Sequence, residues 1–395
     1  MAEKIVYLDN NATSAIAPEV RDVMMPFFGE LYGNPSSMHA FGGQVSKFVE
    51  RAREEAARFI NASPDEIIFT SCATESDNTA IRGCAEYNGK TTKIITTAVE
   101  HPAVLQPVRR LKAQGYQTVE LGVDRVGQID LERLREELKG TNKALVSVMW
   151  ANNETGTIFP IEKVAEICKE YGATLHTDAV QVAGKIPVDV SKVPVDTLAM
   201  SGHKFHAPKG IGLLYVRRGT KLKPFMLGGH QEGGRRAGTE NVPYIVGLAK
   251  ACELARVYMS EDAVKLTALR DRLEAGILAK CPDVLINGDK SNRLPNTLNV
   301  SFEYIEGEAI AYHLSDLGIC ISTGSACASG SLDPSHVIRA MGVPFIAVHG
   351  SVRFSLSRYN TESDIDYVLE KLPPVIKNLR DLSPFGPDSD PTTFK

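Results

Sequence analysis

Lys204 and Asp178 each follow an apolar stretch of the kind that forms a buried strand. Lys204 comes after 196–201 and before a turn rich in proline and glycine, and a second strand within 173–181 ends in Asp178 and Gln181. A lysine in a desolvated pocket can condense with an aldehyde, and an aspartate can pair with a cationic ring nitrogen. A lone lysine is usually a solvated surface charge. Enzymes that use pyridoxal phosphate (PLP) need both groups, so the pair, 26 residues apart, predicts a PLP site on neighbouring strands.

Strand-like and helix-like segments alternate along the first half of the chain. Expected strands lie at 5–8, 66–70, 93–99 and 144–149. Expected helices begin near 18, 41, 73 and 101, and another spans 161–171. Such alternation predicts a parallel sheet with helices on both faces, whose ligand lies at the carboxyl ends of the strands. Just after predicted strands come Thr74, His101, Asn152, Asp178 and Lys204. We expect these five residues to share one site.

The segment 73–77 predicts a phosphate site. Thr74 is expected to be the N-cap of the helix that opens here, with Asp77 three residues later. Free backbone N–H groups and the positive end of the helix dipole would then face an anion. Capping alone would also explain Thr74, so its phosphate role depends on the residues around it.

The second half of the chain predicts another unit. The glycine-rich and charged stretch 227–241 is expected to be an exposed loop that reaches a partner or ligand, and helices follow to about Lys280. From Asn296 onward, expected elements at 297–302, 306–317, 352–356 and 363–372, the last of them a helix, indicate a smaller α+β domain. We therefore divide the chain into a large domain at 14–260, a small domain made of 1–13 and 261–380, and a flexible tail at 381–395.

Cys327 lies in a stretch of small polar residues, 322–331, that cannot anchor a core. Most free cysteines are small buried hydrophobic residues, whereas an exposed thiol ionises and reacts readily. Cys327 is therefore a candidate nucleophile, and we assign the nearby Cys320, which ends an apolar run, to packing.

The composition excludes several classes of protein. The net charge of −4 comes from mixed charges, so neither a nucleic-acid stripe nor a membrane-binding face is indicated. No signal peptide or membrane-spanning run is recognisable, which makes the cytoplasm the expected location. The seven scattered cysteines argue against a disulfide framework or a structural zinc site. The stretch 83–91 is not a P-loop, because its glycines have the wrong spacing and it follows a helix where the motif follows a strand. No dinucleotide-binding glycine motif follows an early strand.

The motifs resemble those of the group I cysteine desulfurases, PLP enzymes of the class V aminotransferase group. The resemblance runs from Tyr7 to about Leu382 and is closest to the nitrogen-fixation type. Its motifs are Asn-Pro-Ser-Ser, Ala-Thr-Glu-Ser, Glu-His, Asn-Asn-Glu-Thr-Gly, Ser-Gly-His-Lys, Arg-Ala-Gly-Thr and the Cys327 loop, in which Ala328 replaces the common threonine. It implies an α/β protein of PLP fold-type I, similar to aspartate aminotransferase, with a mainly parallel seven-stranded sheet and a smaller α+β domain.

The resemblance also implies a role for each site residue. The catalytic residues would be Lys204, Cys327 and His101, with His101 also stacked on the cofactor ring. The other cofactor-binding residues would be Ala73, Thr74, Asn152, Asp178, Gln181, Ser201, His203 and, from a neighbouring subunit, Thr239. Substrate would be held by Asn34, Asn152 and Arg353, whose planar guanidinium matches a carboxylate.

The reaction implied by the resemblance converts L-cysteine to L-alanine and leaves the sulfur on Cys327 as a persulfide. An iron–sulfur scaffold protein would accept this sulfur, either in nitrogenase maturation or in general cluster assembly. The chain would bind no metal by itself, although Cys327 could share a nascent cluster with a partner, and it would form a homodimer. A selenocysteine lyase or another class V aminotransferase is the alternative, because it would need the lysine and aspartate but not the Cys327 loop.

Overall fold

Seven short segments of the chain form one large sheet. The computed structural model describes residues 5–323 and 333–386. In order across the sheet the strands are β2 (Ile67–Thr70), β8 (Gly212–Val216), β7 (Thr197–Ser201), β6 (Thr174–Asp178), β5 (Ala144–Ser147), β3 (Lys93–Thr97) and β4 (Gln117–Leu121). Only β8 runs antiparallel to its neighbours, so the predicted mainly parallel seven-stranded sheet is confirmed.

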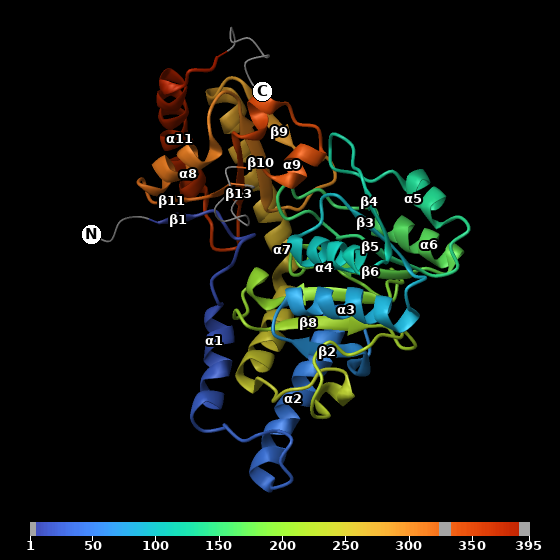
Figure 1. The fold of residues 1–395 in the computed structure, drawn as a ribbon. Coiled ribbons are helices and arrows are strands. Elements are labelled where there is room, and N and C mark those ends of the chain that lie inside the picture. Colours follow the sequence, from blue (N-terminus) through green and yellow to red (C-terminus); the bar gives the residue numbers. More distant parts are fainter. Residues whose placement is uncertain (1–4, 324–332, 387–395) are drawn as a thin grey trace.

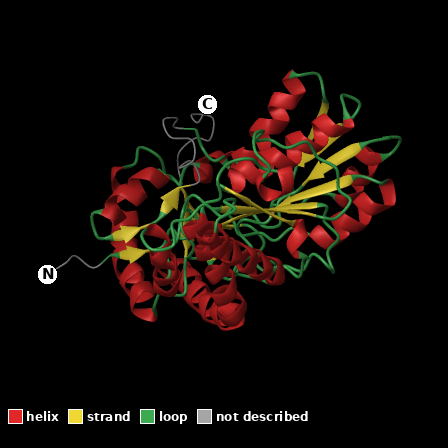
Figure 2. Cartoon of the chain, turned by 90° about the horizontal axis from the view of Figure 1, so that it is seen from below, coloured by secondary structure: helices red, strands yellow, loops and turns green. Residues whose placement is uncertain are grey.

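Helices cover both faces of this sheet because its strands are apolar on both sides. Ile94 of β3 packs with α3 (Ala73–Asn88) and α4 (Pro102–Ala113). The adjacent Ile95 belongs to a larger core on the opposite face, as expected when successive side chains of a strand alternate. The helices of that larger core are α1 (Pro18–Met24), α2 (Ala40–Phe59), α5 (Leu131–Leu138), α6 (Ile161–Tyr171) and the first half of α7 (Val242–Lys280). Figure 2 shows the strands between these helical layers.

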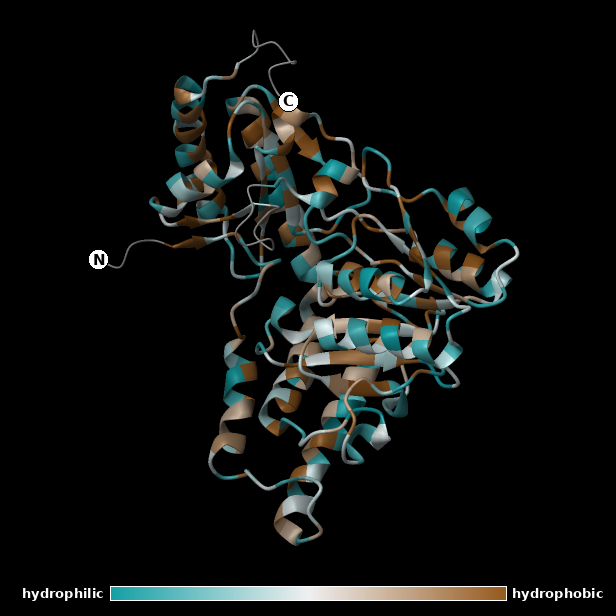
Figure 3. Cartoon of the chain, in the orientation of Figure 1, coloured by the Kyte–Doolittle hydropathy of each residue, from teal (hydrophilic) through white to brown (hydrophobic). Residues whose placement is uncertain are grey.

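The second unit contains smaller sheets and its own core. One sheet has the order β12 (Ser322–Thr323), β13 (Ser351–Ser355), β10 (Thr297–Phe302) and β9 (Val284–Asn287), all antiparallel. The other pairs β1 (Val6–Tyr7) with β11 (Ile319–Cys320) in parallel. The helices here are α8 (Gly307–Ser315), α9 (His336–Ala340), α10 (Phe345–Val348) and α11 (Glu362–Leu382), and α8 and α11 carry hydrophobic and hydrophilic residues in alternation (Figure 3).

The helix α7 joins the two units as one continuous element of 39 residues, the long gold helix of Figure 1. Its buried residues between Val242 and Ala255 belong to the core of the large sheet, whereas those between Leu266 and Ile277 belong to the second core. The domain division predicted at residue 260 lies between these two sets of buried residues. The domain boundaries remain a prediction. None of the helices in the described part of the chain is both long enough and apolar enough to cross a membrane.

Several predicted element ends are corrected by the structure. The helix expected to be capped by Thr74 begins at Ala73, so its N-cap is Cys72 and Thr74 lies in its first turn. The last helix continues past Leu372, through Pro373 and Pro374, because Ile376 in its later turns is buried in the second core. The predicted helix 161–171 is confirmed at both ends.

Candidate active site

A cavity of about 330 Å³ opens at the carboxyl ends of the central strands. This is where ligands bind in open α/β sheets. Nine of the residues predicted from the sequence line it: Ala73, Thr74, His101, Asp178, Gln181, Ser201, His203, Lys204 and Arg353. Of the five strand-end residues expected to share one site, Thr74, His101, Asp178 and Lys204 line this cavity and Asn152 does not.

Lys204 lies directly after a fully buried strand. β7 ends at Ser201, and Lys204 closes the short 3-10 helix η3 (Gly202–Lys204) that follows. Its Nζ donates to the backbone oxygens of Asn11 at 2.6 Å and Ala12 at 2.8 Å. The first turn after β1 thus holds the amine at the edge of the cavity.

Asp178 is the last residue of β6 and is 6% exposed. Its Oδ1 accepts a hydrogen bond of 2.9 Å from the backbone N–H of Val180. Burial raises the pKa of Asp178 to about 6, although the Val180 bond and the charge of Lys204 oppose this shift. A cation bound beside Asp178 would favour the ionised carboxylate, because an opposite charge nearby stabilises the charged form. This wall of the cavity therefore suits a protonated ring nitrogen.

A second buried carboxyl, Asp77, lines the same cavity from α3. Its Oδ1 lies 3.1 Å from Nε2 of His176, whose Nδ1 lies 2.9 Å from the hydroxyl of Thr197. Burial, followed by the charge of Asp178, raises the pKa of Asp77 well above its ordinary value, and burial lowers the pKa of His176 to about 3. His176 is thus neutral, and the charge of Asp178 disfavours ionisation of Asp77.

The first turn of α3 provides an anion site. The side chain of Cys72 at the N-cap makes no capping hydrogen bond to the helix, while Ala73 and Thr74 line the cavity. Uncapped N–H groups and the positive end of the helix dipole suit a phosphate. Glu75 turns away and is buried, where it accepts from the backbone N–H of Ser71 at 2.7 Å and from Arg236 at 2.8 Å.

His101 caps α4 and faces the cavity. Its Nδ1 accepts a 3.1 Å hydrogen bond from the backbone N–H of Ala103. Burial, and then the positive charges of Lys204 and His336, lower the pKa of His101 to about 4. His101 is therefore neutral near pH 7, and its proton is on Nε2 because Nδ1 acts as an acceptor. Such a ring can stack on a flat ligand and exchange a proton through Nε2.

Arg353 reaches the cavity from β13 of the second unit and is 6% exposed. It donates through Nη2 to Asp9 at 2.7 Å and through Nη1 to the backbone oxygen of Asn153 at 3.1 Å. Its Nε has no partner among the residues that the structure describes. A guanidinium held on one side, with a buried donor left over, can bind the carboxylate of an amino acid.

Three predicted site residues do not line this cavity. Asn152 is buried and uses its side chain internally, since Oδ1 accepts from the backbone N–H groups of Glu154 and Thr155 and Nδ2 donates to Val99. Asn34 is exposed and accepts from the backbone N–H of Ser36, and Thr239 is also exposed. Cys327 lies outside the described residues.

Sequence reasoning missed several residues around the cavity. Asp9 had no predicted role, and Asp77 was expected only in the first turn of a helix, whereas both carboxyls line the cavity. Lys185, four residues after Gln181, is buried and donates to it. The sequence offered one signal for this contact, namely that Lys185 lies one turn after Gln181, a predicted cofactor-binding residue.

The chain matches the family described as aminotransferase class-V over residues 6–368. It is 56% identical over 384 residues to a cysteine desulfurase of Trichormus azollae, a match that covers 97% of this chain and 96% of that protein. It is 52% identical over 391 residues to the cysteine desulfurase NifS of Azotobacter vinelandii, covering 98% and 97%.

Solved structures agree with these relatives. A NifS-like protein superposes with a TM-score of 0.90 at 42% identity, covering 95% of this chain and 100% of that one. The protein SspA, solved in complex with cysteine, superposes with a TM-score of 0.78 at 32% identity, covering 90% and 99%. The fold predicted from the sequence and the family it resembles are thus both confirmed, and the chain belongs to the cysteine desulfurases of the class-V aminotransferase family.

Proposed function

We propose that this chain is a PLP-dependent cysteine desulfurase that converts L-cysteine to L-alanine and transfers the sulfur to Cys327. The observation that carries the proposal is that Lys204, Asp178 and the first turn of α3 line one cavity. An amine, an acid for a ring nitrogen and an anion site are the three groups that PLP requires. The full-length similarity to cysteine desulfurases supports the choice of reaction.

The residues around the cavity fit the cofactor. Lys204 would bind its aldehyde, Asp178 its ring nitrogen and Gln181 its ring oxygen. The phosphate would be bound by Ala73, Thr74, Ser201, His203 and Thr239 of a second subunit. When bound, PLP supplies an electron-accepting ring that stabilises charge at the α-carbon of an amino acid. His101 would stack on the ring and carry a proton through Nε2.

L-Cysteine is the proposed substrate. Arg353 would bind its carboxylate, with Asn34 and Asn152 as further predicted contacts. SspA, which shares the fold, was solved with cysteine, and this supports the same substrate here. Uptake of the substrate sulfur by the Cys327 thiol balances the reaction, since cysteine and a thiol become alanine and a persulfide.

The remaining expectations concern partners. We propose a homodimer in the cytoplasm that passes its persulfide sulfur to an iron–sulfur scaffold protein, in nitrogenase maturation or in general cluster assembly. A cluster shared between Cys327 and that partner is the only metal role expected. The full-length similarity to proteins named cysteine desulfurases favours this function over a selenocysteine lyase or another class V aminotransferase.

Purified protein tests the proposal directly. Wild type should show a visible absorption band from bound PLP and should form alanine from cysteine. Lys204→Ala should form none, while its unfolding temperature without cofactor stays near that of wild type, because Lys204 contributes chemistry and little core packing. Alanine formation at the wild-type rate by Lys204→Ala would contradict the proposal, and faster release of alanine from selenocysteine than from cysteine would favour the lyase.

A further inference from the structure

Lys185 is a buried lysine whose two hydrogen bonds go to one residue. It is 8% exposed, and its Nζ donates to both the backbone oxygen and Oε1 of Gln181, each at 3.0 Å. The turn between them depends on Gly184, which has a φ of 71° and a position where a Cβ would lie 2.9 Å from Cβ of Phe205. A side chain there would be strained and would clash. The local backbone is thus shaped to bring the lysine back onto Gln181.

These contacts decide which way the amide of Gln181 points. Oε1 faces the Lys185 amine, and Nε2 donates to the backbone oxygen of Asn11 at 3.1 Å. In the flipped orientation, NH₂ would face an ammonium and an oxygen would face a carbonyl, so donors would meet donors and acceptors would meet acceptors. An amide NH₂ carries two donors, so Nε2 can donate to a ligand in the cavity that Gln181 lines while it keeps its bond to Asn11.

Lys185 is costly to bury. Among the described residues, no carboxylate forms an ion pair with it, and burial together with the charges of Lys204 and Arg353 lowers its pKa to about 7. A buried amine without a counterion destabilises a fold, so stability alone does not explain its presence.

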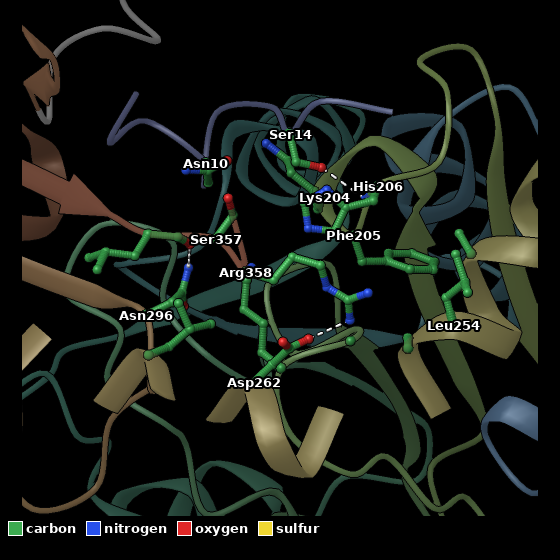
Figure 4. A pocket seen from close by; sticks show the side chains of 16 residues that line it. Asn10, Ser14, Lys204, Phe205, His206, Leu254, Asp262, Asn296, Ser357 and Arg358 are labelled. Atoms are coloured by element: carbon green, nitrogen blue, oxygen red, sulfur yellow. Dashed lines mark hydrogen bonds and ion pairs between the residues drawn. The ribbon is translucent and has the colours of Figure 1, made fainter. Parts of the chain in front are cut away.

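Lys185 also lines a small second cavity, which is shown in Figure 4. Its volume of about 40 Å³ is enough for a water molecule. Polar side chains bound it, among them Asn10, Ser14, Asn296 and Ser357. The third donor of a protonated Lys185 can therefore be hydrated while the other two remain on Gln181.

We propose that Lys185 is a positioning residue for the cofactor: it fixes the Gln181 amide with Nε2 toward the cavity, so that Gln181 serves as a hydrogen-bond donor to the ring oxygen of PLP. The inference rests on the proposed function. Gln181 lines the cofactor cavity and Lys185 lines the small one, so the effect of Lys185 on PLP is exerted through the Gln181 amide.

The test uses holoenzymes of wild type, Lys185→Met, Gln181→Ala and the double variant. The absorption maximum of bound PLP, the pH midpoint of its spectral change and the Kd of PLP for the apoenzyme are measured for each. One hydrogen bond is at stake, so Lys185→Met should weaken PLP binding by about 3- to 10-fold. Its spectrum should shift in the same direction as that of Gln181→Ala. The double variant should be no worse than either single one, because both remove the same contact.

Rescue and charge controls separate positioning from structural damage. Lys185→Arg should return the spectrum toward wild type, since a guanidinium can donate to the same two oxygens and the 40 Å³ cavity leaves room for it. Lys192→Met removes an exposed lysine charge and should change neither the spectrum nor the Kd. If Lys185→Met does not fold, Lys185→Gln takes its place, with an intermediate shift expected from its single donor group.

An unchanged spectrum and Kd in Lys185→Met would overturn the inference, as would a double variant whose loss is the product of the two single losses. These outcomes are distinct from a failure of the proposed function, in which wild type itself would show no PLP absorption and no alanine formation.

Discussion

The side chains of Arg353 and Asp9 meet at 2.7 Å although the two residues lie 344 positions apart in the chain. Asp9 follows β1, which pairs with β11, and it also forms a bridge with Ser355 at the end of β13. The N-terminal segment thus lies along the strand that carries Arg353. It orients the guanidinium from one side and leaves the cavity side for a ligand.

Replacing Arg353 by lysine should raise the KM for cysteine. A point charge would replace a planar group whose charged hydrogen bonds are worth on the order of 1.5–3 kcal/mol, which corresponds to about 10- to 100-fold. The PLP content should not change. The matched control is Arg272→Lys on the exposed side of α7, which should behave as wild type. An unaltered KM in Arg353→Lys would mean that another cation holds the carboxylate.

Asp178 should lower the stability of the apoenzyme at neutral pH. Its folded-state pKa of about 6 exceeds the ordinary value of 3.8. The folded state therefore binds the proton more tightly than the unfolded chain does, and stability falls as pH rises through this window. Asp178→Asn keeps an oxygen for Val180 but cannot ionise. Its apoenzyme should be more stable than wild type by on the order of 1–3 kcal/mol above about pH 6, with little difference near pH 4.

Denaturant unfolding of both apoenzymes between about pH 4 and about pH 8 measures this difference. Asp189→Asn is a control of opposite sign, because a hydrogen bond from Ser191 contributes most to lowering the pKa of Asp189 to about 2. The contribution of Asp189 is nearly complete above about pH 4, so Asp189→Asn should be less stable than wild type by a similar amount across this range. PLP should reverse the order for Asp178, since the holoenzyme of wild type gains a charge pair that Asp178→Asn lacks. A difference that is constant across the pH range would contradict the buried-carboxyl explanation.

Thr239 should act in the neighbouring subunit. Its loop is attached from the inside by Arg53 with Glu232 at 2.7 Å and by Arg236 with Glu75 at 2.8 Å, while Thr239 itself is exposed. Lys204→Ala and Thr239→Asp should each be inactive alone, because the second places a carboxylate beside a phosphate. Subunits unfolded and refolded together should recover alanine formation, since one site of each mixed dimer would then contain Lys204 and an intact Thr239.

The control for this mixture is Lys204→Ala with Asp178→Ala. Both residues belong to the same subunit's site, so no mixed dimer would contain an intact one. Recovery in neither mixture, together with a monomer in sedimentation, would remove Thr239 from the proposed site.

Local patterns were enough to predict five strands of the large sheet and several residues at its edge, whereas β4 and β8 were not predicted and the seven-stranded sheet was implied by the family resemblance. Strands such as β7 are apolar throughout, and a polar residue directly after such a strand, like Lys204, lies at the carboxyl edge wherever the sheet is parallel. The position and chemistry of Asp178 follow from the same rule. These predictions needed only the neighbouring residues in the chain.

Contacts that depend on the three-dimensional packing of the chain could not be predicted in this way. Asp77 looked like part of a capping box, yet its partner is His176, 99 residues away on β6. The contact of Lys185 with Gln181 is local in sequence, but it depends on a left-handed Gly184 that periodicity does not reveal. The continuation of α11 through Pro373 and Pro374 likewise depends on burial against the second core, which outweighs the cost of proline in a helix.

Cys327 provides the prediction that separates a desulfurase from other PLP enzymes. Cys327→Ser should keep bound PLP and its spectral response to cysteine, because Lys204, Asp178 and Arg353 are unchanged. Sulfur removal should stop, since a serine hydroxyl stays protonated near neutral pH and accepts sulfur poorly, whereas a thiol ionises in part and attacks sulfur well. Mass spectrometry after incubation with cysteine should find added sulfur on the wild-type peptide that contains Cys327 and none on the variant. Cys320→Ser, at a position assigned to packing, is the matched control and should still acquire sulfur on Cys327. If Cys327→Ser formed alanine at the wild-type rate, the sulfur would leave by a route that does not use this thiol, and the enzyme would be a lyase.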